Sequence, residues 1–318
     1  MTRNAAYPGA RTLVLGASGF IGRWVAQKLS EAGAETHQAV RDSADAAAGL
    51  SGRVFEADLT RPDALWGVFE QVRPSVVFNL AGYGVDPSER DPDFSERLNA
   101  WLPLAVCQAA ARWRDGDWPG QQVVHVGSAL EYGEASGDLR EDGPAHPTTV
   151  YGRTKLQGTR QVAACAGELG LRAVTARLFT VYGPGEHRGR LLPSLMDAAR
   201  ASKPIGLTAG TQLRDFTYVE DVAEGLLRLG SAPVEPGAVV NLATGRLTPV
   251  RSFAQIAAQI LAMPTENLKF GAIPSRAEEM RHAPVSVERF RQITGAIPST
   301  GIPEGIRRTL CRLSSSWL

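Results

Sequence analysis

The 318-residue chain has few cysteines and no long apolar run. Its three cysteines, Cys107, Cys165 and Cys311, lie far apart and match no metal-ligand spacing, so we expect free thiols in a reducing compartment and no metal site. No segment approaches the roughly 18 apolar residues of a membrane span, and the first residues have no apolar stretch of signal-peptide length. These absences predict a cytoplasmic protein without a membrane partner.

An excess of charge of one sign is also missing. The 34 basic and 33 acidic residues are scattered along the chain and leave a formal net charge of +1. Nucleic acids and anionic membranes bind surfaces with a marked positive excess. We therefore expect neither as a partner, and the ligand has to be inferred from local motifs.

Short apolar runs rich in valine and leucine alternate with segments of helical period. The strand-like runs and the helical segments follow one another at 12–15, 21–31, 53–55, 62–71, 75–80, 94–112, 122–126, 151–169 and 172–177. Strands that alternate with helices form parallel sheets covered on both faces. The pattern predicts an α/β fold with a doubly wound, Rossmann-type parallel sheet.

The regular alternation of strand-like and helical segments ends at about residue 178, and beyond it prolines divide the chain into shorter segments. We expect residues 1–178 to form a dinucleotide-binding domain to which residues 215–245 return. The segments 179–214 and 246–318 are expected to form a smaller, substrate-binding lobe. No clean linker separates these parts, so the lobe should be assembled from insertions and the C-terminal segment.

A glycine-rich loop, Gly16-Ala17-Ser18-Gly19-Phe20-Ile21-Gly22, directly follows the first predicted strand and leads into a helix. Glycines in such a loop let the backbone turn tightly and let a pyrophosphate approach the N–H groups at the helix N-terminus. A tight turn without a ligand would also use glycine. The position of the loop, between the first strand and an amphipathic helix, favours dinucleotide binding.

The end of the second strand carries Arg41 and Asp42, where the adenosine ribose is expected. An arginine there binds the 2′-phosphate of NADP, whereas an acid accepts hydrogen bonds from the 2′-hydroxyl of NAD. Arg41 favours NADP, but a shift of one residue would present Asp42 and favour NAD. Asp58 and Leu59 follow the third strand and are candidates for contacts with the adenine, although Asp58 could equally cap the next helix.

Tyr151 and Lys155 lie one turn apart on a predicted helix, so both side chains project from one face. A phenol with a pKa of about 10 transfers protons poorly at neutral pH unless a neighbouring ammonium favours the phenolate. Ser128 ends a predicted strand and could polarise a carbonyl, although serine at a strand end is often only a turn residue. Together the three residues predict a proton-transfer site; an aromatic ring packed on a lysine stem is the alternative.

These motifs, with several later ones, resemble the extended short-chain dehydrogenases, the nucleotide-sugar epimerase and dehydratase family. The match runs in order from about residue 12 to 245 and includes Asn79-Leu80-Ala81-Gly82, Asn99, the run from Arg177 to Gly185 and the run from Arg214 to Asp221. The resemblance implies that Ser128, Tyr151 and Lys155 are the catalytic residues and that the cofactor contacts Leu80, Ala81, Gly82 and Asn99. It also implies that Arg214, and more loosely Arg276, binds the diphosphate or nucleotide of the substrate.

Two departures from the family pattern narrow the reaction. Members that resemble sugar 4,6-dehydratases have acids where this chain has Ala129 and Leu130, and Glu131 comes one residue too late, so we do not expect dehydration. Thr180 stands where the family usually has an asparagine that faces the substrate. Tyr83, Ala129, Glu131, Thr180 and His187 remain candidates for the substrate cavity; His187 is either a second acid-base group or a solvent-facing loop residue.

We therefore predict an NADPH-dependent reductase of the keto group, at C4, of an NDP-4-keto-6-deoxysugar. The alternatives are a nucleotide-sugar 4-epimerase with bound NAD, a reductase of small aromatic or steroid carbonyls, and a non-catalytic NADP-binding regulator. The resemblance also implies a homodimer formed through the helices at 94–112 and 151–169.

Overall fold

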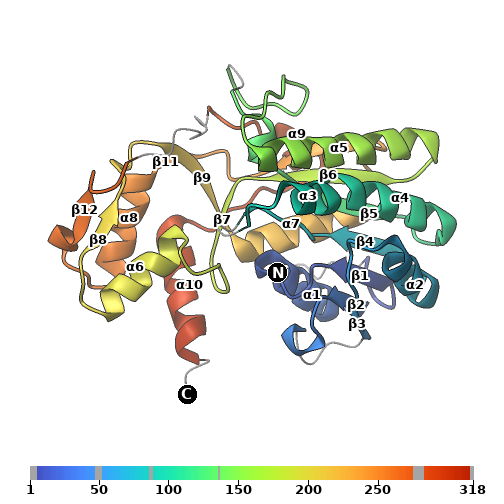
Figure 1. The fold of residues 1–318 in the computed structure, drawn as a ribbon, viewed down its shortest axis with the longest axis horizontal. Helices are drawn as coiled ribbons and strands as arrows, with labels where there is room; N and C mark the ends of the chain where they lie inside the picture. The colour runs from blue at the N-terminus through green and yellow to red at the C-terminus, as the bar shows by residue number, and fades with distance from the viewer. Residues whose placement is uncertain (1–5, 47–51, 86–88, 135–136, 275–282, 316–318) are drawn as a thin grey trace.

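A parallel sheet of seven strands forms the centre of the protein (Figure 1). The computed structural model describes residues 6–46, 52–85, 89–134, 137–274 and 283–315. In sheet order the strands are β10 (Ala238–Leu242), β6 (Ala173–Leu178), β5 (Val123–Ser128), β4 (Val76–Asn79), β1 (Arg11–Leu15), β2 (Glu35–Val40) and β3 (Val54–Glu56). The predicted parallel sheet is confirmed, and the chain reverses its direction across the sheet between β1 and β4.

Helices cover both faces of this sheet, as the Rossmann prediction requires. One face packs against α1 (Phe20–Glu31), α7 (Val219–Ser231) and α9 (Glu288–Thr294), and the other against α2 (Pro62–Val72), α4 (Leu102–Arg112) and α5 (Val150–Glu168). The central strands are consequently buried on both sides, which explains why strands such as β1 and β4 are nearly continuous apolar runs rather than alternating ones. Within the described ranges, no helix is long and apolar enough to cross a membrane.

The helix expected over 94–112 is divided into three parts: α3 (Pro92–Glu96), a π-helical turn η2 (Arg97–Trp101) and α4. Pro103 has no N–H group to donate to the carbonyl of Asn99, which weakens the regular helix there. Gly158 of α5 packs against the same turn, so closely that a Cβ on it would lie 2.0 Å from the Asn99 carbonyl oxygen. Turns of this kind occur frequently at functional sites, and this one places Asn99 in the buried interior.

A smaller lobe lies beside the carboxyl edge of the sheet, at the left of Figure 1. It contains α6 (Leu191–Arg200), β8 (Ile205–Leu207), α8 (Val250–Ile260), η4 (Thr265–Asn267), β12 (Leu268–Phe270) and α10 (Ile302–Ser315). Its core includes Phe253, which stacks on Phe216 with 4.2 Å between ring centroids. Helix α9 lies within the segment 246–318 yet packs on β10 and α7 of the large sheet, where Phe290 is buried.

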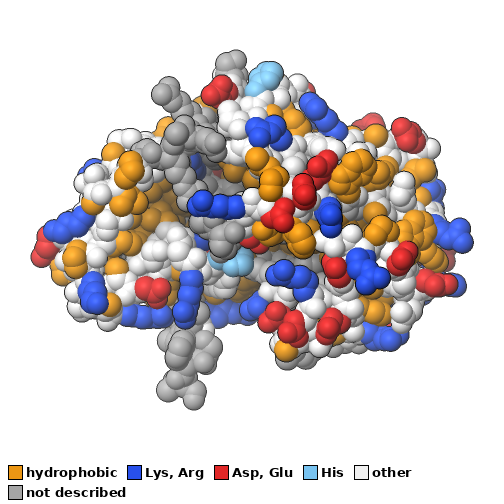
Figure 2. All heavy atoms as spheres, viewed as in Figure 1, with side chains coloured by type: hydrophobic (Ala, Val, Ile, Leu, Met, Phe, Trp, Pro, Cys, Tyr) orange, Lys and Arg blue, Asp and Glu red, His pale blue; other side chains and the backbone are white. Residues whose placement is uncertain are grey.

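A three-stranded sheet joins the two parts, with the order β11 (Leu247–Pro249), β9 (Leu213–Tyr218) and β7 (Thr180–Tyr182). Asp215 of β9 is fully buried and anchors the neighbouring loop, because it accepts hydrogen bonds from the N–H groups of Thr244 and Arg246, each at 3.0 Å. Two 3₁₀ turns, η1 (Ser43–Asp45) and η3 (Ala129–Glu131), follow β2 and β5. Basic and acidic side chains are interspersed over the face drawn in Figure 2.

Candidate active site

The glycine loop joins β1 to the N-terminus of α1 at the carboxyl edge of the sheet. Gly16 has a φ of 75°, and a Cβ on it would lie 2.9 Å from the backbone nitrogen of Ala81. A Cβ on Gly22 would lie 2.1 Å from the carbonyl oxygen of Gly16, and one on Gly19 would lie 3.2 Å from the same atom. The loop has no room for side chains, so its backbone can lie close to a ligand.

The N-terminus of α1 carries no competing anion. Its N-cap is Gly19, no side chain caps it, and its first turn has no acidic residue. The open N–H groups and the positive end of the helix dipole therefore suit an anion, and a dinucleotide pyrophosphate fits this cradle of Gly16, Gly19 and Gly22. Ser18, Phe20 and Ile21 lie on the same loop and first turn.

The end of β2 presents an arginine rather than an acid. Arg41 is exposed directly after the strand, whereas the carboxylate of Asp42 accepts a hydrogen bond from the backbone nitrogen of Ala44 at 2.9 Å and caps η1. A second guanidinium lies beside the glycine loop, because Arg23 donates from Nε to the carbonyl oxygen of Ser18 at 2.7 Å. This end of the site is therefore suited to a 2′-phosphate.

Asp58 forms its own turn after β3. Its carboxylate accepts hydrogen bonds from the hydroxyl and the backbone nitrogen of Thr60, at 2.7 and 3.0 Å, and these hold the pKa of Asp58 below its usual range, with Arg61 and Arg41 contributing. The N-cap of α2 is Arg61, so Asp58 does not cap that helix. Its exposed position next to Leu59 leaves the predicted adenine contact as a proposal.

The loop after β4 lies against the glycine loop and is held from behind by Asn99. The Oδ1 of Asn99 accepts from the backbone nitrogen of Tyr83 at 3.0 Å, and its Nδ2 donates to the Tyr83 carbonyl at 2.7 Å and to Thr154 at 3.1 Å. Asn99 is fully buried. In contrast to the expected cofactor contact, its side chain binds protein groups, while Leu80, Ala81 and the exposed Gly82 line the loop itself.

Tyr83 is turned toward α3. Its ring packs on Phe94 with 5.1 Å between centroids, and its hydroxyl accepts from the backbone nitrogen of Asp91 at 3.4 Å. We expected Tyr83 to line the substrate cavity, but its hydroxyl binds the backbone of Asp91 instead.

Ser128 and Tyr151 meet where β5 ends and α5 begins. The Ser128 hydroxyl hydrogen-bonds to the Tyr151 phenol, and its oxygen also accepts from the backbone nitrogen of Leu130 at 3.2 Å. The pKa of Tyr151 is raised to about 12, mainly by burial; Ser128 and Arg190 lower the pKa, and the charge of Glu131 raises it. Without a bound ligand the phenol is protonated at neutral pH and can donate a proton.

Lys155 lies one turn along α5, with a side chain that is almost completely buried. Its Nζ donates to the carbonyl oxygen of Val126, and a Cβ on Gly82 would lie 4.0 Å from it. The ammonium is therefore between α5 and the loop after β4, on the side where the cofactor is expected. Burial lowers the pKa of Lys155 to about 8, opposed by the charge of Glu131, so the group is an ammonium at neutral pH.

The turn after Ser128 presents no carboxyl group to Tyr151. Ala129 and Leu130 are apolar. Glu131 is fully buried, and its carboxylate accepts hydrogen bonds from Ser128 N, Thr159 and Arg177. Glu131 comes one residue too late in the sequence for a dehydratase acid, and in the structure its side chain binds these other partners.

The loop between β7 and α6 covers the N-terminus of α1. The indole nitrogen of Trp24 donates to the carbonyl oxygen of Pro184 at 3.0 Å, and a Cβ on Gly185 would lie 3.7 Å from the Phe20 ring. His187 lies on this loop and is exposed, in agreement with the solvent-facing alternative.

The neighbouring Glu186 is a candidate that the sequence analysis missed. Its side chain is only 6% exposed, its Oε1 lies 3.5 Å from Nε of Arg190, and its Oε2 is buried without a hydrogen-bond partner in the described part of the chain. Burial raises the pKa of Glu186 to about 7, although Arg190 opposes the shift. Arg190 also acts on Tyr151, so the pair is close to the predicted catalytic residues. An acid in a Gly-Pro-Gly loop is typically exposed, and the sequence contains no signal of this burial.

The predicted substrate contacts Thr180 and Arg214 lie on adjacent strands of the three-stranded sheet. Thr180 begins β7 and pairs with Phe216 of β9, and Arg214 is half-buried with a guanidinium that donates to the carbonyl oxygen of Leu213 at 2.7 Å. Arg276 lies outside the described residues.

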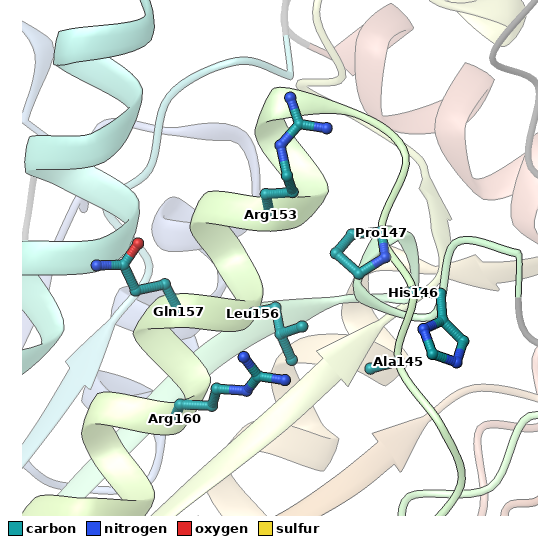
Figure 3. Close-up of a pocket in the computed structure, with 7 residues that line it drawn as sticks. All are labelled: Ala145, His146, Pro147, Arg153, Leu156, Gln157 and Arg160. Atoms are coloured by element: carbon teal, nitrogen blue, oxygen red, sulfur yellow. The ribbon is translucent and has the colours of Figure 1, made fainter.

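An open cavity of about 460 Å³ lies on the outer face of α5 (Figure 3). Its lining consists of Ala145, His146, Pro147, Arg153, Leu156, Gln157 and Arg160. With about 100° of rotation per residue, Arg153 and Arg160 point away from the helix face that carries Tyr151 and Lys155. The cavity is therefore separate from the predicted catalytic residues and lies on the surface where a dimer contact is expected.

Residues 12–243 match the NAD dependent epimerase/dehydratase family. The chain belongs to this family. It is 30% identical to a GDP-6-deoxy-D-mannose reductase of Pseudomonas aeruginosa over 94% of this chain and 96% of the relative. It is 29% identical to a dTDP-6-deoxy-L-talose 4-dehydrogenase (NAD(P)(+)) of Kitasatospora kifunensis over 94% of both. The solved structure of MoeE5 in complex with UDP-glucuronic acid and NAD is similar, with 28% identity, a TM-score of 0.81, and coverage of 96% of this chain and 99% of MoeE5.

This membership confirms the predicted extended short-chain dehydrogenase family and an NAD(P)-dependent enzyme. It does not distinguish reductases from epimerases.

Proposed function

We propose that the protein is an NADPH-dependent reductase of the C4 keto group of an NDP-4-keto-6-deoxysugar. The observation that carries the proposal is the environment of Tyr151: one protonated phenol hydrogen-bonded to Ser128, with no carboxyl group offered by Ala129 and Leu130. Such a site can move a proton on one oxygen but has no second acid in this turn to take a proton from the sugar carbons. Two relatives named above act on 6-deoxysugar nucleotides as a reductase and a 4-dehydrogenase.

The choice of NADPH rests on the end of β2. Arg41 is exposed there while the carboxylate of Asp42 caps η1, so a 2′-phosphate meets a cation instead of an acid. Arg23 adds a positive charge beside the glycine loop. A net reduction needs a reduced cofactor that is taken up for each turnover, which a site built for NADPH would support.

The residues then have distinct roles. Bound NADPH supplies the hydride. The Ser128 hydroxyl donates a hydrogen bond to the keto oxygen and orients it, and Tyr151 gives its proton to that oxygen as negative charge develops. Lys155, one turn along α5 from Tyr151, carries a buried ammonium whose charge would favour the phenolate that Tyr151 leaves behind.

Substrate recognition is proposed for the lobe formed by residues 179–214 and 246–318. Thr180 and Arg214 lie on β7 and β9, where that lobe joins the sheet. A guanidinium binds a diphosphate in two-point geometry, so Arg214 is our candidate for the diphosphate of the substrate. We propose a homodimer through the outer faces of α4 and α5; the cavity of Figure 3 lies on α5 and the loop before it.

A 4-epimerase with bound NAD is the second candidate, and the similarity to MoeE5, solved with UDP-glucuronic acid and NAD, favours it. The two reactions differ in their cofactor balance. A reductase consumes one NADPH for each product, whereas an epimerase oxidises and re-reduces C4 without net consumption.

The test is to mix the purified protein with NADPH and the dTDP, GDP, CDP and UDP forms of a 4-keto-6-deoxysugar. We expect loss of NADPH absorbance with at least one of them. If none of the four forms consumed NADPH and the protein interconverted UDP-glucose and UDP-galactose, the epimerase would be favoured. If Tyr151→Phe left every measurable activity unchanged, a non-catalytic NADP-binding regulator would be the better reading.

A further inference from the structure

Behind Ser128 lies a buried ion pair that the proposed reaction does not use. Glu131 of η3 is fully buried, and its Oε2 lies 2.8 Å from Nε of Arg177 on β6, which is 4% exposed. The hydroxyl of Thr159 on α5 donates to the same oxygen at 3.0 Å. The other oxygen, Oε1, accepts from the backbone nitrogen of Ser128 at 2.7 Å. One carboxylate therefore joins β6 and α5 to the backbone of a proposed catalytic residue.

The chain leaves space for this carboxylate at Gly127. A Cβ there would lie 2.5 Å from Oε1 of Glu131, a contact that real side chains do not make. Arg177 in turn lies over the ring of Tyr132, 4.5 Å from its centroid. Buried ion pairs are costly, and apolar replacements are often as stable, so stability alone is a weak reason for such a cluster.

We propose that Glu131 is a positioning residue of the active site: its carboxylate, held by Arg177 and Thr159, fixes the turn that presents Ser128 to Tyr151. This inference rests on the proposed function. Ser128 is the N-cap of η3, with its N–H bound to Glu131 and its oxygen accepting from Leu130 N. Because these contacts hold the backbone and the oxygen of Ser128, they keep its hydroxyl beside Tyr151, where it can donate to the reacting oxygen.

The same carboxylate offsets the charge of Lys155. Burial favours the neutral amine of Lys155 and the charge of Glu131 favours the ammonium. Burial also holds the pKa of His125, which faces Lys155, well below its usual range, so this imidazole is neutral. In the described part of the chain, further charged groups around the cluster are Arg177 of β6, Arg190 before α6, Glu89 before α3 and Glu141, which acts on Tyr132. Without Glu131, Lys155 and Arg177 would be two buried cations, and Lys155 would lose its proton at lower pH.

The charge effect is measured without substrate, by a pH titration of ¹³Cε-labelled lysine NMR signals. The chain has four lysines, Lys28, Lys155, Lys203 and Lys269, so loss of one signal in Lys155→Met assigns it. We expect the Lys155 signal to titrate near pH 8 in the natural protein and at least about one pH unit lower in Glu131→Gln. Glu134→Gln, at an exposed position nearby, is the control and should leave the titration unchanged. An unshifted titration in Glu131→Gln would overturn the charge effect.

The positioning effect is measured with Gly127→Ala, which keeps the charge but displaces the carboxylate from Ser128. We expect kcat to fall at least about tenfold with NADPH binding unchanged, and the Lys155 titration to move downward, also if Glu131→Gln does not fold. Gly116→Ala is the matched control, since a Cβ there meets nothing within 4 Å. A folded Gly127→Ala with the natural kcat would refute the inference. If the natural protein reduces no nucleotide sugar, the proposed function fails, while the lysine titration still decides the coupling between Glu131 and Lys155.

Discussion

The stability of the protein should depend on pH through Glu186, and Glu186→Gln should remove that dependence. The carboxyl group is 6% exposed, and burial raises its pKa from 4.5 to about 7. Between these two values the folded chain binds the proton more tightly than the unfolded chain does. The free energy of unfolding therefore falls as the pH rises from about 4.5 to 7, and above that range the folded state contains a buried, poorly paired carboxylate.

The size of this effect follows from the shift. At about 1.4 kcal/mol per pKa unit, a rise from 4.5 to about 7 corresponds to about 3 kcal/mol between acid and alkaline conditions. For a chain of this length, that difference corresponds to roughly 5 °C in Tm. Glutamine keeps the shape and an acceptor for Arg190 but cannot ionise, so Glu186→Gln should melt higher than the natural protein above neutral pH and nearly equally at about pH 5.

The assay is thermal denaturation followed by circular dichroism across this pH range, with and without NADPH. Glu134→Gln is the matched control, since the exposed Glu134 should show no such difference. A Tm difference between Glu186→Gln and the natural protein that is the same at acid and alkaline pH would refute the reasoning, because it would show that the carboxyl does not titrate between the two values.

Three further predictions concern the cofactor and the proposed acid. Gly22→Ala should abolish NADPH binding in a fluorescence titration, because its Cβ would lie 2.1 Å from the Gly16 carbonyl oxygen, whereas Gly67→Ala, with open space, should bind normally. Arg41→Ala should weaken NADPH binding about tenfold or more and leave NADH binding unchanged, and equal losses for both would argue against a 2′-phosphate contact. Tyr151→Phe should lower kcat by roughly 10²- to 10⁴-fold while the Kd for NADPH stays constant, and a kcat within twofold of the natural value would contradict its role as the acid.

Much of the fold could be predicted from the sequence because its signals are local. Strands such as β1 and β4 are short, mainly apolar runs, buried on both faces, and the helices between the strands have their own period. The π-helical turn at Asn99 could not be predicted in the same way, since it depends on Pro103 and on the close approach of Gly158 from a helix more than fifty residues later. Contacts of that range leave no periodic trace in the sequence.

The residues of the candidate site also differ in whether they have a local signal in the sequence. Tyr151 and Lys155 are visible because their spacing is that of one helical turn, and the glycine loop because it directly follows a strand. Glu131 and Glu186 have no comparable signal in the sequence. What sets these two acids apart is their burial, and the burial of an acid depends on what the rest of the chain packs against it. Arg177 faces Glu131 and Arg190 faces Glu186, and these pairs can be recognised only in the folded structure.

The central claim is that hydride and proton are both added to one sugar carbonyl, with Tyr151 as the proton donor. The most direct measurement is mass spectrometry of the sugar nucleotide formed from a 4-keto-6-deoxysugar nucleotide and NADPH deuterated at C4 of the nicotinamide, on the face that is transferred. The account predicts one deuterium per product molecule, one NADPH consumed for each, and almost no product from Tyr151→Phe. Isomerised sugar nucleotide without deuterium and without consumption of NADPH would contradict it.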